Sequence, residues 1–354
     1  MARRIRRPSG PLDLRTQAIL RAVIDEYVTT AQPVGSAALV ERYRLGLSSA
    51  TVRNVLAELE TAGLLGHPHT SAGRVPTDAG YRYYVSSIVD AFSLPAVEEL
   101  MIRHQFGQVE FASEHWFRLA ATTLASLTRA AGLATPAKPR AAHLRRLDLV
   151  SISERMASVI LVLREGALRQ VLMTLDEPTD QATLNSVAAM LNDVISGRSA
   201  REAEQRLNLL AAGGESLALH RRVGERAVRA LREFDSAAIE DVFSDGLLNV
   251  MAAPEFAHSD KLRRVFAALE DRATLGGLVD RVAGSPDVHV FIGHENPSSE
   301  MADVSLILAP YGQPSRAVGV VGVLGPTRMA YPQAIGTVRF VSGLMNELLD
   351  HLYA

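Results

Sequence analysis

The chain has 354 residues, of which 47% are hydrophobic and 21% are charged, a balance typical of a globular protein with two or three domains. Its longest strongly apolar stretches, at residues 156–163 and 317–324, are far shorter than the roughly 20 residues of a membrane-spanning helix. Residues 8–13 contain prolines, a glycine and an aspartate where a signal peptide needs an apolar core. We therefore expect a cytoplasmic protein with no transmembrane segment.

The sequence contains no cysteine, which excludes disulfides, thiolate zinc sites, iron–sulfur clusters and cysteine nucleophiles. It also contains no P-loop, no G-x-G-x-x-G after a strand, no G-x-S-x-G elbow and no H-E-x-x-H helix. The ten histidines are scattered along the chain. We therefore predict no catalytic residue, no cofactor and no metal ligand.

The net charge of −2 hides an asymmetry between the two ends of the chain. Residues 1–90 carry 11 arginines against 8 acidic residues, so the rest of the chain is acidic. Lys138 and Lys261 are the only lysines, which can reflect genome composition alone. A small positive excess does not by itself predict nucleic-acid binding, because the arginines must share a face.

The first 65 residues predict three helices joined by short turns. Apolar residues at helical spacing indicate the first helix over residues 12–27, and a second follows over residues 37–43 after the N-cap Ser36. Ser48 or Ser49 caps a third helix. Three helices with a tight second turn are typical of a helix-turn-helix.

The third helix has an exposed face of unusual composition. Its buried stripe consists of Val52, Val55, Leu56 and Leu59, so the opposite face carries Ala50, Asn54, Ala57 and Thr61, flanked by Thr51 and Arg53. Small residues allow close approach to a DNA groove, Asn54 can bond adenine and Arg53 can bond guanine. Ser48 and Ser49 stand at the helix start, which suits phosphate. The alternative is an amphipathic helix that packs against another domain.

Residues 65–76 have the pattern of a β-hairpin that would form a wing. A strand-like start leads to the Ser71-Ala-Gly tip, where glycine permits a positive φ. A polar hairpin after a recognition helix reaches phosphates or the minor groove. His67 and His69 could instead be metal ligands, but no third ligand is near in sequence, so we predict no metal site. The groups available for the backbone are His69, Thr70, Ser71 and Arg74.

Thr77 is the predicted cap of a fourth helix, which is rich in tyrosine. Tyr81, Tyr83 and Tyr84 could stack on bases, but tyrosines at helical spacing more often form a packing seam. We favour the seam, which would lead into the next domain.

Several linked motifs lie at fixed spacing in the first part of the chain. They are Ser48-Ser-Ala-Thr-Val-Arg-Asn, Glu58-Leu-Glu, Gly63-Leu-Leu, Pro68-His-Thr-Ser-Ala-Gly-Arg-Val-Pro-Thr and Gly80-Tyr-Arg-Tyr-Tyr-Val. Taken together, these motifs resemble the N-terminal domain of the bacterial heat-inducible transcription repressor family HrcA. Near the far end, Leu324-Gly-Pro-Thr-Arg-Met with Tyr331 is similar to the C-terminal signature of the same family.

The remainder of the chain predicts a mixture of helices and strands. Residues 91–135 have helical spacing, and a proline-rich connector follows at residues 136–140. Strands at residues 147–152, 157–163 and 168–175 predict an antiparallel meander, covered by a helix that Gly197 ends. Further strands at residues 288–292, 304–308 and 317–324 precede a last helix.

Residues 198–283 are mostly helical and charged. Because they separate two halves that could share one sheet, we predict that they are an insertion. One helix in this region contains Arg221, Arg222, Arg226, Arg229 and Arg232. It could be a second nucleic-acid surface, but interleaved glutamates favour a salt-bridged face.

The resemblance implies an α+β multidomain fold. Residues 1–90 would form a winged helix-turn-helix domain, and residues 91–197 and 284–354 the two parts of a GAF-like α/β domain. Residues 198–283 would form an inserted dimerisation domain, mostly helical. The predicted DNA-binding residues are Ser48, Ser49, Ala50, Thr51, Arg53, Asn54, His69, Thr70, Ser71 and Arg74.

The resemblance also implies a function. A homodimer would repress heat-shock chaperone operons of the groE and dnaK type through the inverted-repeat CIRCE operator, release them on heat stress, and depend on a GroEL-type chaperonin. One alternative is a regulator that senses a small effector through its GAF-like domain. Another is a protein-interaction module whose helix-turn-helix packs on a partner.

Overall fold

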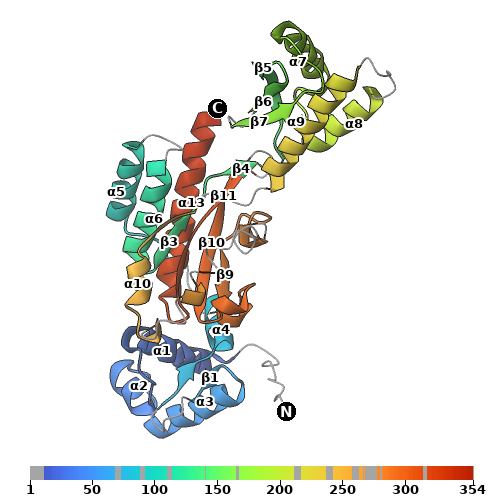
Figure 1. Ribbon diagram of the computed structural model, residues 1–354. Coiled ribbons are helices and arrows are strands. Elements are labelled where there is room, and N and C mark those ends of the chain that lie inside the picture. The colour runs from blue at the N-terminus through green and yellow to red at the C-terminus, as the bar shows by residue number, and fades with distance from the viewer. Residues whose placement is uncertain are drawn as a thin grey trace, which may run out of the picture. The chain divides into compact units, whose positions relative to one another are not determined.

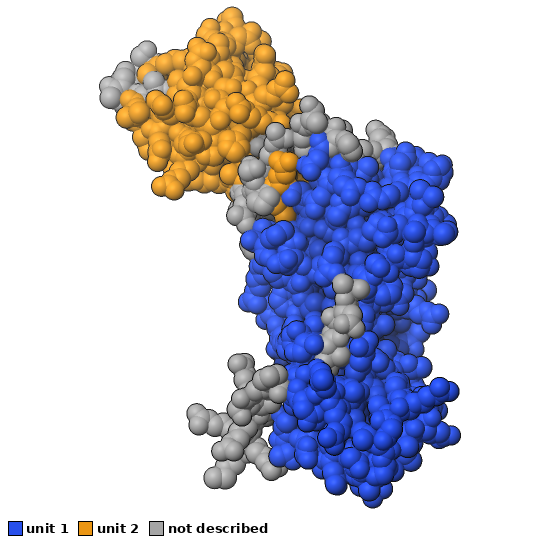
Figure 2. Space-filling model, turned by 180° about the vertical axis from the view of Figure 1, so that it is seen from behind, with its two compact units in different colours: residues 1–136, 241–312, 319–354 blue, residues 137–240, 313–318 orange. Residues whose placement is uncertain are grey.

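The computed structural model divides the chain into two compact units, which Figure 2 distinguishes by colour. Unit 1 contains residues 1–136, 241–312 and 319–354, and unit 2 contains residues 137–240 and 313–318. The structure describes residues 12–67, 73–87, 92–109, 114–139, 141–164, 167–210, 217–236, 242–256, 263–265, 267, 277–279, 281–313 and 317–353. Within these ranges no helix is both long and apolar enough to cross a membrane.

Unit 1 begins with the helices and the two-stranded ribbon that the sequence predicts (Figure 1). In the antiparallel ribbon, Leu65 is opposite Pro76 and Gly66 is opposite Val75. The second helix starts one residue earlier than expected, with Gly35 in place of Ser36 as its N-cap. The elements are α1 (Leu14–Thr30), α2 (Ser36–Arg42), α3 (Ser49–Thr61), β1 (Leu65–Gly66), β2 (Val75–Pro76) and α4 (Asp78–Ser87).

Local capping and a shared apolar core explain why these helices form. The Asp13 side chain accepts a hydrogen bond from the Thr16 N–H at 2.7 Å, which caps α1. Gly63 follows α3 with a φ of +76°, a conformation that favours glycine at the end of a helix. The core between α1 and α3 is closed to solvent, since Leu20 and Leu59 are both 0% exposed.

The rest of unit 1 is built on a sheet with the strand order β8-β3-β11-β10-β9. The short strand β4 (Lys138–Pro139) of unit 2 pairs with the first two residues of β11, which also belong to unit 2. Strands β10 and β11 are buried over most of their length, which explains their nearly continuous apolar sequence. In Figure 1, helices α5, α6 and α13 lie beside this sheet. The elements of this part of unit 1 are α5 (Ala96–Gly107), α6 (Glu114–Thr128), β3 (Ala131–Ala134), β8 (Phe243–Asp245), α10 (Leu247–Met251), β9 (His289–Ile292), β10 (Val304–Gln313), β11 (Ala317–Pro326) and α13 (Tyr331–Tyr353).

The expectation that residues 91–135 are entirely helical is wrong at its end. α6 stops at Thr128, Arg129 adopts a φ of +54°, and β3 follows as a fully buried strand. A short run of small apolar residues suits a helix and a buried strand equally well, so periodicity alone could not separate them. Gly132 shows why the strand needs small residues, because a side-chain carbon there would lie 2.0 Å from the carbonyl oxygen of Ala121.

Unit 2 contains the predicted meander, in which β5 (Leu144–Ser153), β6 (Met156–Leu163) and β7 (Leu168–Thr174) are antiparallel neighbours. Helices α7 (Gln181–Ile195), α8 (Ala200–Leu210) and α9 (Ala218–Ser236) share one apolar core with this sheet. As expected, arginines of α9 form ion pairs with acidic residues, among them Arg222 with Asp176 and Arg232 with Glu204.

The meander was expected to share a sheet with the last strands of the chain, and this expectation is wrong, because it forms a separate three-stranded sheet. The boundaries of the inserted unit also differ from the predicted residues 198–283, since the compact unit extends over residues 137–240. The reason is packing: Val223 and Leu231 of α9 are 0% exposed in the same core as Leu161 of β6. Helix periodicity identifies a buried face but not the sheet that covers it.

Candidate nucleic-acid interface

α3 presents the face that its sequence predicts. Val52 and Leu59 are 0% exposed, whereas Ala50, Arg53 and Asn54 are exposed on the other side of the helix. Among the residues that the structure describes, neither the Arg53 nor the Asn54 side chain has a hydrogen bond or an ion pair. Both side chains are therefore available to a ligand, and Ala50 leaves room for close approach to them.

The two serines before this face serve the fold of the segment. The Ser48 Oγ accepts a hydrogen bond from the Thr51 N–H at 3.1 Å and lies 2.9 Å from the Thr51 hydroxyl, so Ser48 is the N-cap. The Ser49 Oγ lies 3.0 Å from the Ser36 Oγ, which connects the starts of α2 and α3. The predicted capping is confirmed for Ser48. The N-terminus of a helix carries a partial positive charge, so the start of α3 favours a negatively charged group nearby.

The tip of the predicted wing, residues 68–72, lies outside the described residues, and so do His69, Thr70 and Ser71. The structure does describe Arg74, whose Nη2 is 2.7 Å from the Glu60 Oε2 on α3. Its backbone exchanges hydrogen bonds with Val34, at 2.8 Å and 2.9 Å. Arg74 is therefore fastened to α3 and to the α1–α2 connection, with its side chain 20% exposed.

Gly73, which precedes Arg74, needs to be glycine. It has a φ of +151°, and a side-chain carbon at this position would lie 2.8 Å from the carbonyl carbon of Pro33. The returning strand consequently packs directly against the backbone before α2. This contact fixes the base of the two-stranded ribbon against the α1–α2 connection.

The tyrosine-rich helix α4 is a packing seam, as predicted. The Thr77 hydroxyl accepts a hydrogen bond from the Gly80 N–H at 3.1 Å and donates to the Gly63 carbonyl at 2.7 Å. Tyr81 is 2% exposed and its ring centroid lies 5.5 Å from that of Tyr331. Burial raises the pKa of both phenols. The Tyr81 ring is therefore not available to stack on a base.

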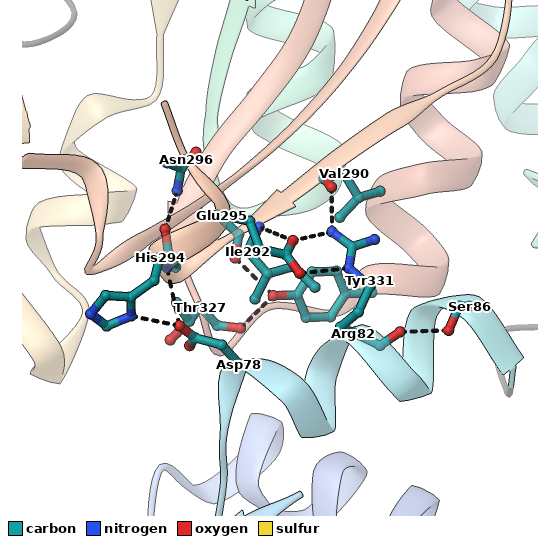
Figure 3. A network of polar contacts seen from close by, with 12 residues as sticks. Asp78, Arg82, Ser86, Val290, Ile292, His294, Glu295, Asn296, Thr327 and Tyr331 are labelled. Carbon is teal, nitrogen blue, oxygen red and sulfur yellow. Dashed lines mark hydrogen bonds and ion pairs between the residues drawn. The ribbon is translucent and has the colours of Figure 1, made fainter. Parts of the chain in front are cut away.

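A network of polar contacts around α4 was not predicted from the sequence. Figure 3 shows Asp78 beside His294 and Arg82 beside Glu295. The hydrogen bond to Glu295 raises the pKa of Arg82, so this guanidinium stays charged. Arg328 makes a further contact and belongs to the C-terminal signature noted in the sequence. Nothing in the local sequence of residues 293–295 indicated that they contact α4.

Comparison with known proteins gives consistent results over nearly the whole chain. A family model described as the HrcA protein C terminal domain matches residues 114–335. A heat-inducible transcription repressor HrcA from Roseiflexus castenholzii is 42% identical over 343 residues, which cover 96% of this chain and 95% of the relative. The HrcA repressor from Chloroflexus aurantiacus is 39% identical over 356 residues, which cover 98% and 96% of the two chains.

A solved structure supports the fold. It belongs to a protein described only as hypothetical, has a TM-score of 0.57 and 22% sequence identity, and covers 95% of this chain and 98% of its own. The sequence relatives are named for transcription repression, and the exposed face of α3 suits the DNA binding that repression requires. On the family model and these relatives, the chain belongs to the HrcA family of heat-inducible transcription repressors.

Proposed function

We propose that the protein represses transcription by binding an inverted-repeat DNA operator as a homodimer, with α3 of each protomer in the major groove. The observation that carries this proposal is the exposed face of α3, on which Arg53 and Asn54 are unpaired among the described residues and Ala50 gives room for close approach. Arginine bonds guanine and asparagine bonds adenine through two hydrogen bonds each, so this pair can recognise base sequence.

The other predicted residues have supporting roles in this proposal. Ser48, Ser49 and Thr51 surround the N-terminus of α3, where backbone N–H groups attract a phosphate. Phosphate contacts position a protein on DNA, whereas base contacts determine sequence preference. We expect the wing residues His69, Thr70 and Ser71 to contact the backbone, and Arg74 to hold the wing against Glu60 while its exposed part faces the DNA.

The open face of the sheet in unit 2 supports a homodimer. α7 and α9 pack on one side of β5, β6 and β7, and large apolar side chains remain exposed on the other. Val150 and Leu172 both lie next to Ser158 in the strand register, so they share this open face. Monomeric proteins rarely expose contiguous apolar patches of this kind. The exposed residues are Val150 (41%), Ile152 (55%), Leu168 (61%) and Leu172 (57%).

The identity of the target genes rests on the family likeness alone. We propose chaperone operons of the groE and dnaK type, a CIRCE operator, release on heat stress and a GroEL-type chaperonin as partner. We likewise propose that residues 1–90 form a winged-helix domain and that the sheet of unit 1 is the GAF-like domain. The relatives are named as heat-inducible repressors, which gives no support to the alternative of a small-effector sensor.

The dimer on the operator can be tested with one charge placed on the open sheet face. We expect Leu172→Glu to shift the protein from dimer to monomer in sedimentation experiments and to weaken binding to a two-half-site operator. A matched control is Leu209→Glu, because Leu209 on α8 is 72% exposed and lies outside the sheet. A Leu172→Glu protein that remains dimeric and binds the operator normally would contradict this interface.

A further inference from the structure

Two groups of polar contacts fasten the DNA-binding segment, residues 12–87, to the rest of unit 1. We propose that these contacts narrow the range of half-site spacings that the repressor accepts, because they fix the position of α3 within unit 1. The inference rests on the proposed function, since half-site spacing matters only for a dimer on an inverted repeat. The residues that form this joint are Asp78, Arg82, Glu255, His294, Glu295 and Arg328.

The first group holds the middle of α4 through Arg82 (Figure 3). Its Nε donates to the Glu295 Oε1 at 2.8 Å, and its Nη2 donates to the Val290 carbonyl at 2.5 Å and to the second oxygen of Glu295. The Glu295 Oε2 also accepts from the Ile292 N–H at 3.0 Å. A planar guanidinium bound at three oxygens has one orientation, whereas a single hydrogen bond would leave it free to rotate.

The same group holds the N-terminal end of α4 through Asp78. The Asp78 Oδ2 accepts from the His294 N–H at 3.1 Å and lies 2.8 Å from the His294 Nδ1. Gly293 adopts a φ of +52°, and a side-chain carbon there would lie 2.3 Å from the Asp78 Oδ2. A side chain at this position would therefore displace the Asp78 carboxylate from its contact with His294.

The second group holds α1. The Arg328 Nη1 donates to the Val28 carbonyl, near the end of α1, at 2.6 Å, and its Nε donates to the Glu255 Oε1 at 2.6 Å. The Arg328 side chain is only 15% exposed. The Tyr81 ring of α4 also packs on the Tyr331 ring of α13. Since α1 and α4 are attached at separate points, the segment cannot turn about either attachment alone.

This attachment has a consequence for operator choice. After one protomer binds its half-site, binding of the second becomes intramolecular, and its effective concentration is highest when the geometry of the protein matches the spacing of the DNA. Dimers that place a helix in the major groove bind half-sites that are about one turn of the DNA helix apart, or a whole number of turns apart. A rigid joint removes one source of variation in the distance between the two α3 helices, so it narrows the range of spacings that are bound well. A loosened joint lowers the affinity at the best spacing and allows the dimer to bind a wider range of spacings.

The test compares full-length wild type with the variant Arg82→Ala/Arg328→Ala. The probes are a single half-site duplex and a series of operator duplexes whose spacer is changed by one, two or five base pairs. For wild type we expect affinity to fall about tenfold or more when the half-sites are rotated by half a turn. For the variant we expect half-site affinity within about twofold of wild type and a several-fold flatter dependence on spacing.

Two further proteins make the comparison specific. Arg103→Ala removes an arginine that pairs with Glu347 in the same unit but outside the joint, so it should keep the spacing profile of wild type. Arg82→Glu/Glu295→Arg reverses the pair, and combined with Arg328→Ala it should recover part of the spacing preference that Arg82→Ala/Arg328→Ala loses. If the double alanine variant does not fold, Glu295→Gln provides a variant of the same shape without the charge.

The outcomes distinguish this inference from the function on which it rests. Wild type that binds operator and scrambled DNA equally would refute the proposed function itself. Wild type with a sharp spacing preference that every folded joint variant retains would overturn only the role of the joint. A variant that also loses binding to the single half-site would overturn it too, because the contacts would then support the recognition helix and not its position.

Discussion

The proposed recognition face of α3 gives the most specific prediction. In the variant Arg53→Ala/Asn54→Ala, each protomer loses two side chains that are exposed and make no intramolecular bond among the described residues. Surface substitutions of this kind change the free energy of unfolding by about 0.5 kcal/mol or less. The fold and its thermal midpoint should therefore stay close to those of wild type, and any change in DNA binding should come from lost contacts.

The expected loss of operator-binding free energy can be estimated from the contacts that Arg53 and Asn54 would make with bases. A bidentate contact between a side chain and a base contributes about 1–3 kcal/mol of discrimination. The two residues, counted in both protomers of a dimer, would contribute about 4–12 kcal/mol if fully additive. Contacts in one network are not additive, so we take the lower end, about 4 kcal/mol, as the expected loss. This corresponds to roughly a thousandfold weaker operator binding.

Fluorescence anisotropy with operator and scrambled duplexes at one salt concentration measures this loss. We expect the variant to bind the operator about as weakly as wild type binds scrambled DNA. Arg201→Ala on α8 is the control, because it removes an exposed arginine in unit 2. An unchanged ratio of operator to scrambled affinity would refute base recognition by α3. Equal weakening on both duplexes would instead show that the pair contacts phosphates.

Two further predictions concern the stability of the segment. Gly80→Ala should lower the free energy of unfolding by about 1–3 kcal/mol, because the new side-chain carbon would lie 2.1 Å from the Leu64 carbonyl oxygen. Urea titrations measure this loss. Gly107→Ala is the control, because there is open space around Gly107 and no loss is expected. Burial raises the pKa of the Asp25 carboxyl above its ordinary 3.8, because the folded protein favours the neutral carboxyl. The stability that the neutral carboxyl contributes is therefore fully present below pH 3.8 and is lost as the pH rises through the raised pKa of the folded protein. Asp25→Asn should therefore unfold at a higher temperature than wild type at pH 7 and lose this advantage in acid, and a constant difference across pH would contradict the assignment.

Much of the structure of residues 12–87 could be predicted because the sequence signals there are local. The N-cap Ser48, the buried stripe that ends at Leu59 and the cap Thr77 each depend on residues within one helical turn. The tyrosine seam was also correct for Tyr81, since regular helical spacing indicated a buried face. The assignment of Arg53 and Asn54 to DNA contact remains a prediction, although their exposure fits it.

The parts that were missed depend on contacts between distant residues. Arg82 and Glu295 are 213 positions apart, and neither has a neighbour in sequence that indicates the pair. The sequence of β3 fits a helix as well as a strand, because a run of alanine and glycine suits both periodicities, and only its packing on α6 decides between them. The separate sheet of unit 2 was missed for the same reason, since strand patterns do not specify their partners.

The central claim is that this protein binds an operator by sequence, and a gel-shift titration tests it most directly. Purified protein would be titrated against an inverted-repeat chaperone operator and a scrambled duplex at fixed salt, with and without a GroEL-type chaperonin. We predict tight binding to the operator alone, strengthened by the chaperonin. Equally weak binding to both duplexes, whether or not chaperonin is present, would contradict the account.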